Sequence, residues 1–170
     1  FRIPDWMDPR SPTIVAEIVG LQDLAPTLLD AASIPIPDSM DGMSLLPFAR
    51  GERPAWRSYL HGEHSGREGG EESERVPGNQ YLTDARQKFI WFSGDGREQL
   101  FDLVADPMEL HDLAPDGTHA DALAMWRTRL IGELRDRPEG YVDGDRLVAG
   151  RRPFLPDELR PEFNPTQLPR

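Results

Sequence analysis

The densest group of chemically active side chains is the segment His61-Gly62-Glu63-His64. Imidazole and carboxylate groups bind metal ions, and a histidine can act as a general acid. The segment closes a run typical of a β-strand, in which alternate side chains point to opposite faces. His61 and Glu63 would therefore share one face while His64 lies on the other. Without a bulge the three cannot converge, so we expect no metal site here.

Aromatic residues form a second candidate group because they could stack on a sugar or aromatic ring. Packing between a sheet and a helix explains them more simply. The group comprises Trp91, Phe92, Phe101 and Trp126.

The remaining acidic residues and histidines favour structural roles. Asp23 suits a helix cap, and Asp41 with Gly42 suits a turn. The acidic run 68–74 could bind calcium weakly, although a solvated loop is the simpler interpretation. His111 and His119 are expected at the surface.

Composition narrows the function classes. The chain has 170 residues, a formal net charge of −11 and no cysteine. Disulfides, thiolate metal sites and cysteine nucleophiles are excluded, and the negative charge argues against binding to nucleic acids or anionic membranes. No apolar run could span a bilayer, and the first five residues show no signal-peptide pattern. Separately from these two observations, we expect a cytoplasmic protein.

Hydrophobic patterns predict the elements that carry these residues. A β-branched strand and a helix whose apolar face holds Leu24, Leu28 and Ala31 or Ala32 come first. A four-stranded antiparallel sheet follows, and a capping box at Thr118 and Asp121 begins a helix with the stripe Leu123, Trp126, Leu130 and Leu134. The predicted strands are 13–19, 57–64, 80–84, 88–92 and 98–103. The first predicted helix begins at residue 23, and the second spans 120–135. Residues 141–170 are expected to form an extended arm.

Several segments, taken in order, resemble the C-terminal portion of the sulfatase family, within the alkaline-phosphatase-like superfamily. They are 19–30, the segment Asp41-Gly42-Met43-Ser44-Leu45 with its neighbours, 81–84, 88–92, 99–103 and 106–110. The resemblance covers about 15–135. It implies an α/β protein, α+β for this portion, in which the end of the large sheet precedes a small four-stranded antiparallel sheet packed by a C-terminal helix. The expected domains are 1–56, the end of the large domain; 57–137, the C-terminal subdomain; and 138–170, a Pro-rich extended tail.

The family's catalytic motifs are absent from this chain. Sulfatases resembling it use a formylglycine made from Cys/Ser-x-Pro-x-Arg beside a divalent cation, usually calcium. Ser33-Ile34-Pro35-Ile36-Pro37 has proline where arginine is required, and no Asp-Asn-Gly or Asp-His-Gly occurs. We therefore expect no catalytic residue, metal or cofactor in this chain, which alone would be inactive, while the parent enzyme carries formylglycine and calcium upstream.

Three functions stay open. The first is the C-terminal portion of a sulfatase, whose partner is the N-terminal catalytic part and whose substrate is a sulfate ester. In this function His64 would line the substrate pocket. Lys88 would be either solvated or in reach of a sulfate. The second is the same portion of a phosphonate or phosphate diester hydrolase. The third is a stand-alone, non-catalytic binding module, against which the apolar run 13–19 argues, since it would need covering. Homo-oligomerisation is left open.

Overall fold

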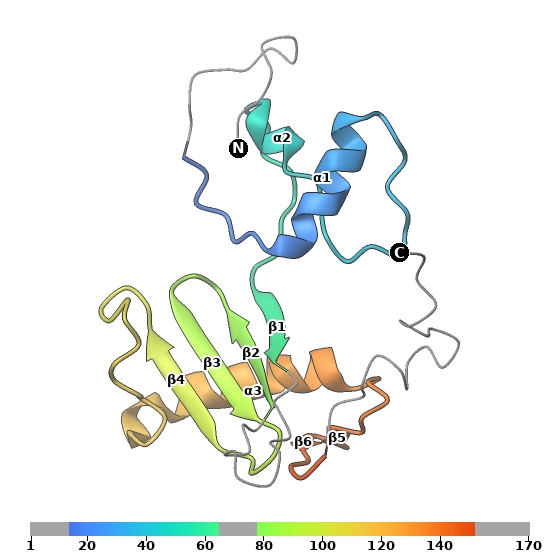
Figure 1. The fold of residues 1–170 in the computed structure, drawn as a ribbon. Coiled ribbons are helices and arrows are strands. Elements are labelled where there is room, and N and C mark those ends of the chain that lie inside the picture. Colours follow the sequence, from blue (N-terminus) through green and yellow to red (C-terminus); the bar gives the residue numbers. More distant parts are fainter. Residues whose placement is uncertain (1–13, 65–77, 152–170) are drawn as a thin grey trace, which may run out of the picture. The chain divides into compact units, whose positions relative to one another are not determined.

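A computed structural model describes residues 14–64 and 78–151. The chain divides into two compact units, 1–60 and 61–170, each with its own internal contacts. The first unit is helical and the second carries a sheet (Figure 1).

The first unit is built on short helices. A 3-10 turn, Leu21–Asp23, leads into helix α1, Leu24–Ala31, and helix α2 spans Leu46–Ala49. Residues 14–19 lie in no strand, so the strand expected at 13–19 is wrong for the described residues. A β-branched run needs a partner to complete its ladder of hydrogen bonds, and no described segment pairs with it.

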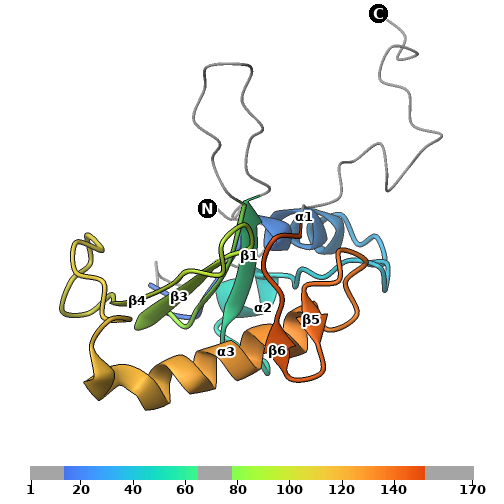
Figure 2. The same cartoon turned by 90° about the horizontal axis from the view of Figure 1, so that it is seen from below.

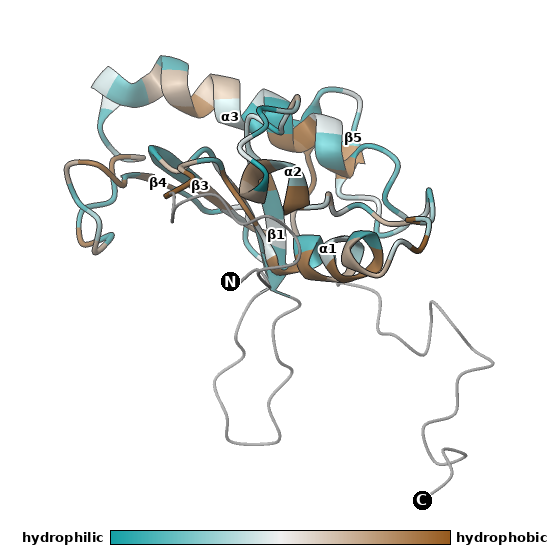
Figure 3. Cartoon of the chain, turned by 90° about the horizontal axis from the view of Figure 1, so that it is seen from above, coloured by the Kyte–Doolittle hydropathy of each residue, from teal (hydrophilic) through white to brown (hydrophobic). Residues whose placement is uncertain are grey.

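The apolar face predicted for α1 is not buried within the described part of this unit. Leu24 is 47% and Leu28 65% exposed, whereas Pro26 and Thr27 are buried. Thr27 turns inward because its hydroxyl donates to the Asp23 carbonyl and accepts from the Leu45 amide at 2.9 Å. Leu24 and Leu28 therefore lie at the surface of the described part of this unit. Figure 3 shows the hydrophobic stretches of α1 along its ribbon.

Gly42 has a different role from the one expected. The local turn lies just before it, where the Met40 amide donates to the Pro37 carbonyl at 3.1 Å. A Cβ at Gly42 would overlap the backbone carbonyl of Gln22. Glycine is needed here because two backbone segments approach closely, not because of an Asp41-Gly42 turn.

The second unit confirms the predicted meander. Strands β1 (Leu60–His64), β2 (Asn79–Thr83), β3 (Gln87–Phe92) and β4 (Glu98–Asp102) follow in that order across one sheet. The β2–β3 and β3–β4 pairs are antiparallel, with Leu82 opposite Phe89 and Phe89 opposite Leu100. These three side chains are fully buried and form the centre of the core.

Helix α3, Ala120–Leu134, lies along one face of this sheet (Figure 2). The predicted stripe is confirmed, since Leu123, Trp126, Leu130 and Leu134 are all buried. The capping box at Thr118 and Asp121 is wrong. Asp116 instead accepts from the Thr118 amide at 2.9 Å and caps a 3-10 turn, Gly117–His119, that precedes the helix.

A hairpin follows α3 where an extended arm was expected. Strands β5 (Val142–Asp143) and β6 (Arg146–Leu147) pair, and the Gly150 amide donates to the Ser93 carbonyl at 2.8 Å. Tyr141 is fully buried, its ring meeting Trp91 edge-on at 5.6 Å between centroids. Residues 141–151 are thus part of the folded unit, and 152–170 lie outside the described residues.

Candidate functional site

Strand β1 carries the cluster that the sequence singled out, and its two faces differ in chemistry. On the face toward α3, His61 Nε2 lies 2.8 Å from Gln80 Oε1, and Gln80 Nε2 donates to Glu63 Oε2 at 3.1 Å. His61 and Glu63 therefore share a face, as the alternation predicted, and the buried Gln80 amide joins them. The two groups bond a neutral amide rather than a common ion.

Arg137, just after α3, extends this network. Its guanidinium donates to Glu63 at 2.8 Å and makes two bonds to Glu139, at 2.7 and 3.1 Å. The Glu139 side chain is only 4% exposed, so its charge depends on this pairing. The bond to Glu139 raises the pKa of Arg137 above its usual range. The pairing ties β1 to the segment leading into the β5–β6 hairpin.

Tyr141 lies beside this network with a buried hydroxyl for which no hydrogen-bond partner is found among the described residues. Burial, reinforced by the negative charge of Glu139, raises the pKa of Tyr141 above its ordinary value. The neutral phenol is therefore the form that fits the folded protein.

The opposite face of β1 carries Gly62 and His64. A Cβ at Gly62 would overlap the Tyr81 ring near its hydroxyl, so the ring lies directly over the glycine. His64, two residues along, shares that face by strand alternation and is exposed. The structure thus separates His64 from His61 and Glu63, as expected.

Lys88 also lies on this second face, on strand β3. Its ammonium is 5.6 Å from the Tyr81 ring centroid and bonds both Glu109 oxygens, at 3.1 and 2.8 Å. Its charge is offset by a carboxylate, which weakens the hypothesis of a sulfate-binding lysine.

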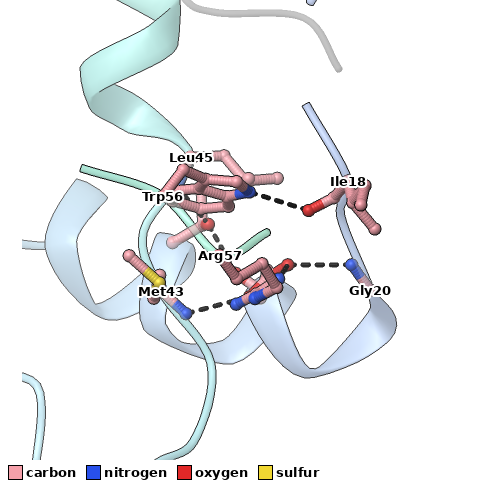
Figure 4. Close-up of polar contacts among 8 residues, drawn as sticks. Ile18, Gly20, Met43, Leu45, Trp56 and Arg57 are labelled. Atoms are coloured by element: carbon pink, nitrogen blue, oxygen red, sulfur yellow. Dashed lines mark hydrogen bonds and ion pairs between the residues drawn. The ribbon is translucent and has the colours of Figure 1, made fainter. Parts of the chain in front are cut away.

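The first unit holds a polar cluster that sequence reasoning only partly found. The Asp23 carboxylate is fully buried and forms a bidentate pair with Arg57, each bond 2.6 Å long. It also accepts from the amides of Gly20 and Met43, at 2.8 and 2.9 Å (Figure 4). Burial alone would raise the pKa of Asp23, but these four bonds outweigh it and hold the pKa below its ordinary value.

This cluster joins three stretches of chain rather than exposing a reactive group. Asp23 stands at the N-cap position of α1 but makes no side-chain cap bond there, so the predicted helix cap is wrong. Its carboxylate instead accepts from the Gly20 amide before the 3-10 turn, and its pairing with Arg57, 34 residues away, carried no local sequence signal. Nearby, the Trp56 indole donates to the Ile18 carbonyl at 2.7 Å and its ring meets Phe48 edge-on. The arrangement is structural.

The other candidates fall where the simpler interpretation placed them, except Phe92, which lies on the face of β3 opposite Phe89 and Trp91. Trp91, Phe101 and Trp126 are buried in the core, and the Trp126 indole donates to Gln87 at 2.9 Å. Phe92 is half-buried, with the Arg97 guanidinium 3.9 Å from its ring centroid. His111 is exposed and lies 3.2 Å from Asp106.

The described residues contain neither a group of metal ligands nor a membrane-spanning helix. Across 14–64 and 78–151, no three acidic or histidine side chains converge as metal ligands would. Nor is any helix in those ranges long and apolar enough to cross a membrane. The acidic run 68–74 lies outside the described residues.

Comparisons with known proteins agree on one family. The family model described as "N-sulphoglucosamine sulphohydrolase, C-terminal" matches residues 1–136. An arylsulfatase of Clostridium perfringens is 44% identical over 134 residues, covering 79% of this chain and 26% of the relative. A Delta 4,5-hexuronate-2-O-sulfatase of Bacteroides thetaiotaomicron is 30% identical over 148 residues, covering 82% of this chain and 29% of the relative.

Solved structures agree with these sequence comparisons. A 2-O GAG sulfatase aligns with a TM-score of 0.58 and 26% identity over 75% of this chain and 27% of its own. The phosphonate monoester hydrolase of Silicibacter pomeroyi aligns with a TM-score of 0.56 and 29% identity over 66% of this chain and 24% of its own. The chain therefore spans about a quarter of the length of the proteins it resembles.

Proposed function

Because this chain belongs to the N-sulphoglucosamine sulphohydrolase C-terminal family of the sulfatases, we propose that it is the C-terminal portion of a longer sulfuric ester hydrolase. In that enzyme it forms part of the substrate cleft and does not itself cleave the ester. The observation that carries this proposal is the outward apolar side of α1, which the described part of the first unit leaves uncovered.

That surface, the α1 apolar face, consists of Leu24 and Leu28 on α1 and Leu21 in the 3-10 turn before it. Their exposed fractions are 86%, 47% and 65%. Exposed leucines grouped on one short segment mark an interface more often than a solvated surface. The proposed partner is the N-terminal catalytic part of the same protein, since the related arylsulfatase is about three times as long as this chain.

A substitution in this face tests the partner. Leu28→Lys should destabilise the longer protein, because it places a charge in the proposed interface, and should leave the isolated chain unchanged. Leu110→Lys is the matched control, since Leu110 is 74% exposed in the second unit. Equal tolerance of both substitutions in the longer protein would reject the interface.

The catalytic groups of the family do not fit the residues of this chain. Formylglycine needs a Cys or Ser in Cys/Ser-x-Pro-x-Arg, and the segment 33–37 ends in proline instead. The described residues also offer no convergent carboxylates for calcium. We place both groups in the N-terminal part and assign no catalytic step to this chain.

His64 is the proposed substrate contact. It is exposed on the side of β1 away from the helix-facing core, and the opposite face of the strand is held by Gln80 and Arg137. An imidazole there can donate to an oxygen of the substrate. Replacement by alanine should raise KM.

A phosphonate monoester hydrolase is the second candidate, favoured by its 29% identity and TM-score of 0.56. Kinetics separate the two. The longer protein should hydrolyse 4-nitrophenyl sulfate faster than 4-nitrophenyl phenylphosphonate or bis(4-nitrophenyl) phosphate. A preference for the phosphonate would replace the first proposal by the second.

We also propose that the protein binds neither nucleic acids nor anionic membranes, which the net charge of −11 supports. A cytoplasmic location and a homo-oligomeric state are further proposals. Cell fractionation and light scattering on the longer protein would test them.

A further inference from the structure

Gly62 is an unusual residue for the middle of a strand. Glycine there costs roughly 0.5–1 kcal/mol relative to alanine, and it often marks a close approach by a ligand or another group. In this chain the close approach is by Tyr81, whose ring and hydroxyl occupy the space that a Cβ would fill. Gly62 thus permits the Tyr81 side chain to lie flat across β1.

Core packing does not account for this arrangement. The side chains that face α3, including Leu82 and Phe89, are fully buried, whereas Tyr81 lies on the other face and is half-buried. A ring placed only to fill the core would need no hydroxyl. Here the hydroxyl end of the Tyr81 ring extends over β1, the strand that also carries His64.

The spacing places two polar groups near one another. Residues two apart on a strand lie about 7 Å apart on the same face, so the Tyr81 hydroxyl, over Gly62, lies about one such step from His64. Lys88 stands over the ring and is held by Glu109, which fixes the ring without adding a net charge to the face. The pair therefore offers a neutral phenol and an imidazole.

We propose that the Tyr81 hydroxyl and His64 form a two-point subsite for an oxygen-bearing substituent, such as a ring hydroxyl, on the alcohol moiety of the sulfate ester. Gly62 is a positioning residue for Tyr81. This inference rests on the proposed function, because it takes the sulfate group itself to be bound by the N-terminal part. Both polar groups can donate a hydrogen bond to such a substituent or accept one from it.

Steady-state kinetics of the longer protein test the subsite with two substrates. One is a monosaccharide sulfate, which carries hydroxyls, and the other is 4-nitrophenyl sulfate, which carries none. Tyr81→Phe and His64→Ala should each raise KM for the sugar ester about five- to tenfold, with kcat little changed and no effect on the aryl ester. Tyr141→Phe, which removes a buried hydroxyl from the same unit, should change neither KM.

Gly62→Ala separates position from chemistry, because it displaces the ring and leaves both polar groups present. It should reproduce the effect of Tyr81→Phe, and it should add nothing in a Tyr81→Ala background, where the overlap is relieved. An unchanged sugar-ester KM in Tyr81→Phe, or a wild type that cleaves only the aryl ester, overturns the subsite and spares the proposed function. A wild type that cleaves no sulfate ester overturns both.

Discussion

Replacing Arg57 by methionine should strongly destabilise the first unit. Asp23 is fully buried, and the Arg57 side chain is 14% exposed, so the substitution leaves a buried carboxylate without its cation. Removing one partner of a buried pair costs about 3–5 kcal/mol. The amides of Gly20 and Met43 still bond Asp23, which places the expected loss near the lower end, about 3 kcal/mol.

The loss should depend on pH in a defined direction. Because the folded pKa of Asp23 lies below its unfolded value, the pair stabilises the protein at pH values above the unfolded pKa, near 3.8. This stabilisation disappears as the pH falls through the still lower folded pKa. The difference between wild type and Arg57→Met should therefore be full near neutral pH and shrink in strong acid.

Chemical denaturation followed by circular dichroism, at neutral pH and at about pH 2, measures both effects. The matched control is Arg53→Met, which removes an exposed arginine from the same unit and should cost less than about 0.5 kcal/mol. If Arg57→Met costs no more than Arg53→Met at neutral pH, or if its cost grows in acid, the assignment of Asp23 and Arg57 as a buried ion pair is refuted.

Three further predictions concern packing and titration. Gly42→Ala should lower the free energy of unfolding by about 1–3 kcal/mol, because the added Cβ meets the Gln22 backbone. Gly132→Ala, in open space on α3, should raise it by up to about 1 kcal/mol. The thermal unfolding temperatures of the two variants should therefore shift in opposite directions. Trp126→Phe should cost about 2 kcal/mol by leaving Gln87 without its indole donor, as urea denaturation would show, and a cost below about 0.5 kcal/mol would argue against that bond. The free energy of unfolding should fall as the pH rises above about 10, because the phenol then ionises in the unfolded state while the raised pKa of Tyr141 keeps it protonated in the folded state. Tyr141→Phe should lose this alkaline dependence. The same dependence of stability on pH in Tyr141→Phe and wild type would contradict the prediction.

The sequence predicted the second unit well because its signals are local. The hydrophobic pattern predicted the strands that carry Leu82 and Phe89, and helical spacing placed Trp126 and Leu130 on one face of the helix; all four side chains are buried. The separation of His64 from His61 and Glu63 followed from the same period of two. The four strands and the helix needed no knowledge of distant residues.

The first unit was predicted less well because long-range contacts decide it. Apolar spacing predicted a shared face for Leu24 and Leu28, yet the polar Asp23 and Thr27 take the interior, where Arg57 and Leu45 supply their partners. The β-branched run 13–19 predicted a strand, but no described segment pairs with residues 14–19. Propensity alone cannot reveal either outcome.

Site residues show the same division. Glu63 was recognisable from its segment, but its partner Arg137 is 74 residues away, and the hairpin after α3 was hidden by the Pro-rich character of the tail. The role of Gly62 emerged only from the path of the Tyr81 ring. Glycine within a strand was the one signal that could have indicated it.

The most direct test of the central claim is hydrolysis of 4-nitrophenyl sulfate, with calcium present, by this chain alone beside the longer protein. We predict clear turnover by the longer protein and none by the chain, because the chain lacks the formylglycine motif. Turnover by the chain alone, retained through repeated purification, would contradict the account, and His61, Glu63 and His64 would then be the first residues to replace.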